Sequence, residues 1–187
     1  RSDHALLVFD PAGLRRIRLD AVLPILHGQN GEDGTVQGLC ALAGIPVAGC
    51  GVLASALCMD KDRAHRLVAA AGIPAPRAVT LTQSYDRATV AAQAAGLGYP
   101  LFVKPVRAGS SFGVAKVRRP SDLFAAVDHA FYYDDHVMLE AQIPGFEVGC
   151  AVLGSDAPLT GVPDEIELQG DLFDFQEKYH LTTSKIH

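Results

Sequence analysis

The alternation of short apolar runs with capped, glycine-terminated segments constrains this fold more than any other sequence feature. Asp33 and Asp60 each precede a stretch with apolar residues at three- and four-residue spacing, and Gly44 and Gly72 follow those stretches. Because such ends are typical of helices, the pattern predicts helices from Asp33 to residue 43 and from Asp60 to residue 71. A buried strand is expected over 21–26, and the resulting alternation favours an α/β fold.

The rest of the chain continues this alternation. The run 101–103 is predicted to form a hairpin with 114–117 across a loop rich in glycine and serine. The other expected elements are strands over 46–48, 78–81, 137–140 and 147–153, and helices over 84–95 and 121–131.

The composition excludes several classes of protein. The 187 residues include 16 Lys and Arg against 21 Asp and Glu, a formal net charge of −5. A nucleic-acid-binding face needs clustered basic residues, which the sequence does not have. No apolar run approaches the roughly 20 residues that cross a bilayer, and no signal segment is visible, so neither a membrane-spanning nor a secreted protein is expected. The cysteines (Cys40, Cys50, Cys58 and Cys150) lack C-x-x-C spacing and are expected to be buried free thiols in a reducing cytosol, without zinc.

The first segment that could carry chemistry is HGQNGEDG, residues 27–34, between the predicted strand and the helix that follows it. Glycines at the carboxyl end of a strand let the backbone turn sharply and approach a ligand closely. Glu32 and Asp33 fall at the helix start, where the helix dipole favours negative charge. The same residues also suit an ordinary capped helix start with a surface histidine at position 27, and both interpretations stay open here.

The second such segment is KPVRAGSSFG, residues 104–113, on the predicted hairpin. Gly109, Ser110, Ser111 and Gly113 supply N–H and hydroxyl groups that can surround phosphate oxygens, and Lys104 adds a cation from the preceding strand. Since no G-K-[ST] follows, the segment is not a Walker A loop. A plain hairpin turn with a solvated lysine is the alternative.

A third segment, GCGVLA at residues 49–54, matches the G-x-G-x-x-A pattern of dinucleotide-binding loops. That pattern requires an acidic residue about 20 positions later. The corresponding stretch, LVAAAGIP at residues 67–74, contains none. A glycine-containing turn is therefore preferred over a nicotinamide-dependent oxidoreductase, which an NADH titration would test.

Five further residues are ambiguous on their own. Lys61 lies in the first turn of a predicted helix, where a cation is unfavourable, which hints at a ligand-facing role. Glu140 and Glu147 stand at strand ends and could contact a ribose or an adenine, or be edge carboxylates. Lys178 and Tyr179 follow an acidic stretch and are either the polar tip of a loop or part of a lid.

In this order the segments resemble the D-alanine–D-alanine ligase family of the ATP-grasp superfamily. The matching strings are HGQNGEDGTVQG (27–38), CMDKDRA (58–64), FVKPVRAGSSFGVAKV (102–117), EAQIPGFEVGCAVLG (140–154) and EKY (177–179). The first string matches a long family signature nearly position by position. GFEVGCAVLG and CMDKDRAH look closer to the vancomycin-resistance branch, which makes D-alanyl-D-serine or D-alanyl-D-lactate. Tyr179 stands where lactate-forming enzymes carry histidine, so the resemblance favours D-serine or D-alanine as the second substrate, with D-lactate as the alternative.

The resemblance also implies roles for individual residues. Contacts with ATP are implied for Lys61, Lys104, Ser110, Ser111, Glu140, Ala141, Glu147 and Lys178. Within this set, Glu140 and Ala141 belong to the strand leading to the adenine, and Glu147 would accept from the ribose hydroxyls. The implied substrate-binding residues are His27, Ser110 and Tyr179, with His27 near the second substrate. The implied catalytic residues are Lys104, Ser110, Lys178, Tyr179 and Glu32, of which Glu32 supports the Ser110–Tyr179 network.

The same resemblance implies an ATP-grasp fold in three parts. These are the end of a Rossmann-like substrate-binding subdomain over 1–56, a central subdomain over 57–140, and the start of a C-terminal subdomain with its mobile loop over 141–187. ATP and two Mg²⁺ ions are implied, with D-alanine and D-serine, D-alanine or D-lactate as substrates, in a cytoplasmic homodimer that builds cell-wall precursors without nucleic acid or membrane partners. The family's glycine-rich opening and its Mg²⁺-ligand segment have no counterpart here, and the metal ligands are expected beyond His187. The chain is therefore expected to be an internal fragment that is inactive alone, and a non-catalytic ATP-binding module is the rival interpretation.

Overall fold

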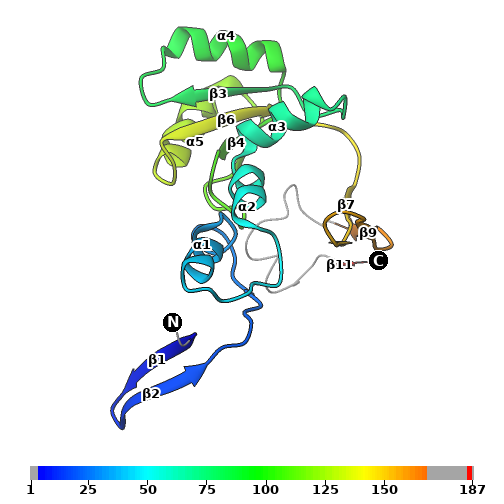
Figure 1. The fold of residues 1–187 in the computed structure, drawn as a ribbon. Helices are drawn as coiled ribbons and strands as arrows, with labels where there is room; N and C mark the ends of the chain where they lie inside the picture. The colour runs from blue at the N-terminus through cyan, green and yellow to red at the C-terminus, as the bar shows by residue number, and fades with distance from the viewer. Residues whose placement is uncertain (1–3, 168–184, 187) are drawn as a thin grey trace. The chain divides into compact units, whose positions relative to one another are not determined.

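The computed structural model describes residues 4–167 and 185–186 (Figure 1), and the chain divides into two units. The first unit comprises the chain up to Ala75 together with Val106–Gly109, and the second comprises Pro76–Pro105 and the residues from Ser110 onward. The subdomain boundaries expected after residues 56 and 140 stay a prediction. Helices and strands are mixed along the chain, as the sequence pattern predicts.

Three helices follow one another in the first unit: α1 (Thr35–Leu42), α2 (Val52–Met59) and α3 (Lys61–Ala70). The predicted cap of α3 is confirmed, because the Asp60 carboxylate accepts from the backbone N–H of Arg63 at 2.9 Å. The predicted cap of α1 is shifted by one residue. Gly34 is its N-cap, and Asp33 instead accepts from the N–H groups of Asn30 and Thr35 at 2.8 and 2.9 Å.

The first unit differs from the sequence-based expectation in two places. Residues 21–26 and 46–48 do not form full strands. They meet in a single parallel bridge between Val22 and Val47, because Pro24 has no N–H to donate and the residues described in the structure add no further pairing there. An antiparallel hairpin of β1 (Ala5–Asp10) and β2 (Gly13–Arg18) precedes this segment and was not predicted.

The second unit is built on a four-stranded antiparallel sheet in the order β3-β6-β4-β5. Its strands are β3 (Ala78–Thr82), β4 (Leu101–Pro105), β5 (Ala115–Val117) and β6 (His136–Ala141). The predicted hairpin of β4 and β5 is confirmed. The helices are α4 (Arg87–Leu97), capped by Asp86, and α5 (Leu123–Phe131), which follows the 3₁₀ turn η1 (Pro120–Asp122) (Figure 1).

The two faces of this sheet have different chemistry. Side chains alternate along each strand, and one set of alternate positions joins α4 and α5 in an apolar core. That core contains Leu81, Val90, Ala94, Leu101, Val103, Val117, Leu123, Val127, Ala130, Val137 and Leu139. The opposite positions include Phe102, Lys104, Lys116 and Glu140, so the charged residues of β4, β5 and β6 share the other face.

Short strands complete the second unit. The predicted strand over 147–153 is interrupted, giving β7 (Glu147–Gly149) and β8 (Val152–Leu153). β8 pairs with β9 (Leu159–Thr160), whereas β10 (Asp164–Glu167) pairs with both β7 and β11 (Lys185–Ile186). None of the helices in the described part of the chain is long and apolar enough to cross a membrane.

The expectation of four buried cysteines is wrong for three of them. All four thiols are free, but only Cys40 is buried, whereas Cys50, Cys58 and Cys150 are exposed. Apolar neighbours do not ensure burial: Cys58 lies on α2, an apolar helix short enough to leave part of its surface in water, and Cys50 and Cys150 lie outside helices and strands.

Candidate functional site

Lys104 and Glu140 form an ion pair on the face of the sheet opposite the apolar core. Lys104 is on β4, and Glu140 is on the neighbouring strand β6, directly opposite Phe102 in the register. The Lys104 ammonium donates to the Glu140 carboxylate, whose side chain is 9% exposed, against 22% for the lysine. The sequence predicted a solvated or phosphate-binding lysine, and the structure places a partly buried cation–carboxylate pair there.

Phe102 and Lys116, which the sequence analysis missed, extend this charged face. The Lys104 and Lys116 ammonium groups lie 5.3 and 5.9 Å from the centre of the Phe102 ring. Both distances allow cation–π attraction. The alternation along the confirmed hairpin could have found Lys116, because it pairs with Phe102 in the register. Two cations and an aromatic ring on one face can hold a flat ring system that carries negative groups.

The loop that joins β4 to β5 has an unusual backbone at its two serines. Ser110 and Ser111 have φ values of 51° and 58°, in the left-handed region that non-glycine residues seldom adopt. Such strained residues cluster at ligand-binding sites, where the surrounding structure holds them. After them, the Phe112 ring stacks on Tyr133 with 6.3 Å between ring centres, and Val114 N–H donates to Ser111 O at 3.3 Å.

Lys61 binds backbone carbonyl groups of the first unit. Its Nζ donates to Ala108 O at 2.8 Å and to Val106 O at 3.3 Å, and its backbone N–H donates to Val106 O at 3.1 Å. These acceptors explain how a lysine is tolerated in the first turn of a helix, where the dipole disfavours it. The implied contact of Lys61 with ATP phosphates stays a prediction.

The segment 27–34 is a compact loop closed by its own acids. Glu32 accepts from the N–H of Gly28 at 2.5 Å, and the Gln37 side chain donates to Gly31 O at 3.1 Å from within α1. Burial opposes the ionisation of Asp33, but hydrogen bonds from Asn30 and Thr35 outweigh this effect and hold the pKa of its carboxyl below the usual value. The sequence analysis missed Gln37, which is buried on α1.

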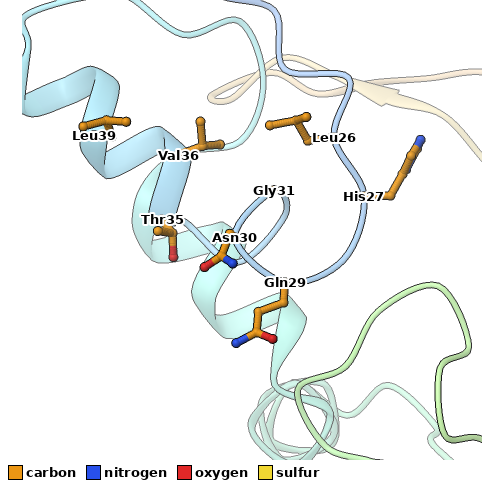
Figure 2. Close-up of a pocket in the computed structure, with 8 residues that line it drawn as sticks. All are labelled: Leu26, His27, Gln29, Asn30, Gly31, Thr35, Val36 and Leu39. Atoms are coloured by element: carbon orange, nitrogen blue, oxygen red, sulfur yellow. The ribbon is translucent and has the colours of Figure 1, made fainter. Parts of the chain in front are cut away.

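A pocket of about 390 Å³ adjoins this loop. Its lining residues are Leu26, His27, Gln29, Asn30, Gly31, Thr35, Val36 and Leu39 (Figure 2). In Figure 2, Leu26, Val36 and Leu39 form an apolar row, and the polar side chains of Asn30 and Thr35 lie to one side of it. The volume falls in the range of small-molecule sites, roughly 300–1,000 Å³. His27, which is implied near the second substrate, is therefore on the wall of a pocket of suitable size.

The structure brings some of the predicted residues together and leaves others apart. In the first unit, His27 and Glu32 share one loop, and Lys61 binds Val106 and Ala108. In the second unit, Lys104 contacts Glu140, and the next residue, Ala141, is buried and pairs with Leu101.

Glu147 is apart from the Lys104–Glu140 pair. Glu147 is exposed on β7, in a different sheet from Glu140. Lys178 and Tyr179 lie outside the described residues. Their implied roles, like that of Glu147, stay predictions.

One group of potential metal ligands occurs within 4–167 and 185–186. Ligand atoms of Asp134, Asp135 and His136 lie within 4.8 Å of one another at the start of β6. The Asp134 carboxylate accepts from the His136 N–H at 3.2 Å, and His136 Nδ1 lies 2.6 Å from the Asp135 carboxylate. These bonds account for the turn without a metal ion.

Comparison with known proteins gives consistent matches along the chain. Residues 7–50 match the family model described as "D-ala D-ala ligase N-terminus", and residues 67–187 match "D-ala D-ala ligase C-terminus". The vancomycin B-type resistance protein VanB of Enterococcus faecalis is 44% identical over 174 residues, covering 92% of this chain and 49% of VanB. The D-alanine–D-alanine ligase A of Chromobacterium violaceum is 47% identical over 163 residues, covering 87% of this chain and 44% of that protein.

Solved structures agree with these matches. The crystal structure of VanG D-Ala:D-Ser ligase from Enterococcus faecalis superposes with a TM-score of 0.81 at 52% identity, covering 98% of this chain and 56% of VanG. This chain spans about half the length of the curated relatives it matches. The fold is that of the ATP-grasp ligases, and the chain belongs to the D-alanine–D-alanine ligase family.

Proposed function

We propose that the intact protein carrying this chain is an ATP-dependent D-alanine–D-X ligase, with D-serine or D-alanine as X. The observation that carries the proposal is the juxtaposition on the second unit's sheet. A partly buried Lys104–Glu140 pair lies on β4 and β6, and β4 leads into a loop whose two serines have a strained left-handed backbone. The names of VanB and VanG connect two of the relatives to vancomycin resistance and to D-serine.

The chemistry of such a ligase suits these residue types. A carboxylate is a poor electrophile, so the γ-phosphoryl group of ATP is first transferred to the D-alanine carboxylate, which gives an acyl phosphate and ADP. The amine of the second substrate then attacks the acyl carbon, a C–N bond forms, and inorganic phosphate leaves. The protein's tasks are to position the reactants and to stabilise negative charge on the transferred group.

The residues of the site can share these tasks. Lys104 supplies a cation for a phosphate oxygen, and Glu140 holds that cation on the sheet face. Ser110 and Ser111 supply hydroxyl and N–H donors from a loop that can cover the phosphates. His27 and Glu32 act at the substrate end, from the loop beside the 390 Å³ pocket.

Two further groups complete the proposal. Lys178 and Tyr179 would close over the site and exclude water, because water would hydrolyse the acyl phosphate. Two Mg²⁺ ions would neutralise phosphate charge when bound. Within the described residues, the carboxylate paired with Lys104 is Glu140, which is engaged by that cation. We therefore route no step of the reaction through a metal ion held by this chain.

An ¹⁸O-labelling assay with two readouts tests the proposal on the intact protein. D-alanine with ¹⁸O in its carboxylate is supplied with ATP and an equimolar mixture of unlabelled D-alanine, D-serine and D-lactate. Appearance of ¹⁸O in inorganic phosphate reports the acyl phosphate, and mass spectrometry identifies the product. We expect dipeptide with D-serine or D-alanine, and its share over the D-lactate ester should grow as the pH rises, because amines react in the deprotonated form.

Three outcomes would contradict the proposal. Binding of ATP without phosphate release would identify a non-catalytic nucleotide-binding module. Exclusive formation of D-alanyl-D-lactate at every pH would retain the ligase but replace its second substrate. Phosphate release without ¹⁸O transfer would exclude the acyl phosphate and with it the proposed order of steps.

A further inference from the structure

The segment Val106–Gly109, which we name the 106–109 strap, belongs to a different unit from the residues on either side of it. Pro105 and Ser110 are part of the second unit, whereas the strap belongs to the first. Sequence-based reasoning places residues 104–113 on one hairpin, with a single loop rich in glycine and serine after the strand that carries Lys104. The structure instead divides this stretch into an anchored beginning and a strained middle at Ser110 and Ser111.

Lys61 is the main anchor of the strap. Its backbone N–H and its ammonium both donate to Val106 O, at 3.1 and 3.3 Å, and the ammonium also donates to Ala108 O at 2.8 Å. A charged donor makes the stronger class of hydrogen bond to a neutral carbonyl. The Asp60 cap fixes the start of α3, so Lys61 projects from a well-defined helix end.

A close backbone contact secures the other end of the strap. A Cβ atom added at Gly109 would lie 2.7 Å from Gly28 Cα and 3.3 Å from Gly28 N. Only glycine permits this approach without a backbone shift. The Gly28 N–H donates to Glu32, so the strap lies against the loop that contains the predicted substrate-binding residue His27 and the predicted catalytic residue Glu32.

We infer that Lys61 is a positioning residue that holds the 106–109 strap on the first unit, so that the phosphate-covering serines follow a fixed backbone. Its catalytic consequence rests on the proposed ligase function, whereas its structural part does not. If Lys61 only bound phosphate, replacing it would leave the strap unaffected when no nucleotide is present. A positioning Lys61 holds the strap with or without ATP.

Trypsin provides a direct readout, because the exposed Arg107 lies inside the strap. The intact protein is digested briefly without nucleotide, and mass spectrometry compares cleavage after Arg107 with cleavage after Arg118 as an internal reference. Lys61→Met, which keeps an unbranched stem but no donor, should raise the Arg107/Arg118 ratio by about tenfold, the change expected when a charge-assisted hydrogen bond is lost. Lys61→Arg, which keeps charged donors, should restore a ratio close to the original.

A second variant keeps the test decisive if Lys61→Met destabilises the whole protein. Gly109→Ala leaves Lys61 intact but pushes the strap away from Gly28, and it should also raise the ratio. Gly96→Ala is the matched control, because a Cβ there meets nothing within 4 Å. An unchanged ratio in Lys61→Met overturns the inference, whatever the ratio in Gly109→Ala. If the ratio rises but the intact protein forms no dipeptide, the strap is confirmed and the proposed ligase function is wrong.

Discussion

Replacing Lys104 by methionine tests whether the Lys104–Glu140 pair stabilises the sheet as well as serving the nucleotide. The substitution keeps a long unbranched stem and removes the ammonium. Because the Glu140 side chain is only 9% exposed, the variant leaves a carboxylate with little access to water. Loss of one partner from a fully buried ion pair costs about 3–5 kcal/mol. Since about a fifth of the Lys104 side chain is exposed, water screens part of the pair, and we expect a loss of about 2–3 kcal/mol.

A double-mutant cycle assigns that loss to the pair. Glu140→Gln in the Lys104→Met background removes the carboxylate charge that has lost its Lys104 partner, and it should recover more than about 1 kcal/mol. Urea unfolding of the intact protein, followed by circular dichroism, measures all four species. Lys116→Met is the matched control on the same face, and it should cost less than Lys104→Met because it leaves the Lys104–Glu140 pair in place.

Activity adds a second readout to the same cycle. Lys104→Met should lower the rate of phosphate release with ATP and D-alanine more than tenfold, and Glu140→Gln should not restore it, because the cation itself is missing. The reasoning fails if Lys104→Met unfolds within about 0.5 kcal/mol of the unmodified protein. It also fails if the double variant is less stable than Lys104→Met. Near-normal turnover would remove Lys104 from the mechanism.

Three further predictions concern other parts of the chain. Gly113→Ala should raise the KM for ATP and lower the rate, because φ at Gly113 is +69° and a Cβ would lie 2.5 Å from Tyr133 Cδ2. Adding Tyr133→Ala should relieve the defect in part, and equal defects in the single and double variants would contradict this. Asp33 stabilises the fold above its unfolded pKa near 3.8, and this contribution is lost as the pH falls through its lower folded pKa. The melting temperature should therefore fall more steeply between pH 7 and pH 3 in the unmodified protein than in Asp33→Asn. Leu139→Ala, at a position with 0% exposure, should cost about 2–5 kcal/mol in urea unfolding, whereas Leu153→Ala, at 74% exposure, should change stability by less than about 0.5 kcal/mol.

Local signals predicted the elements that have strong end markers. Asp60 predicted the start of α3, and the apolar runs on either side of the glycine–serine loop predicted the β4–β5 hairpin. The same alternation placed Lys104 on a strand. These predictions succeeded because capping bonds and hairpin pairing are decided by residues close together in the sequence.

The errors arose where structure depends on distant residues or on competing local signals. The run 21–26 is apolar enough for a strand, but Pro24 limits its pairing, and it forms one bridge. Residues 49–54 were interpreted as a glycine turn, whereas α2 begins at Val52. The acceptors of Lys61 at residues 106 and 108 could not be predicted, since no sequence signal connects positions more than 40 residues apart.

Because the 106–109 strap belongs to the first unit, it affects how the chain folds during synthesis and how it can be cut into fragments. The chain leaves the first unit at residue 75, returns to it for four residues, and leaves again. During synthesis, α3 emerges from the ribosome before residues 76–105. Lys61 therefore cannot bind the carbonyl groups of Val106 and Ala108 until the intervening residues have been translated. A fragment that ends at residue 75 would therefore lack the 106–109 strap, and a complete first unit would need those four residues to be added.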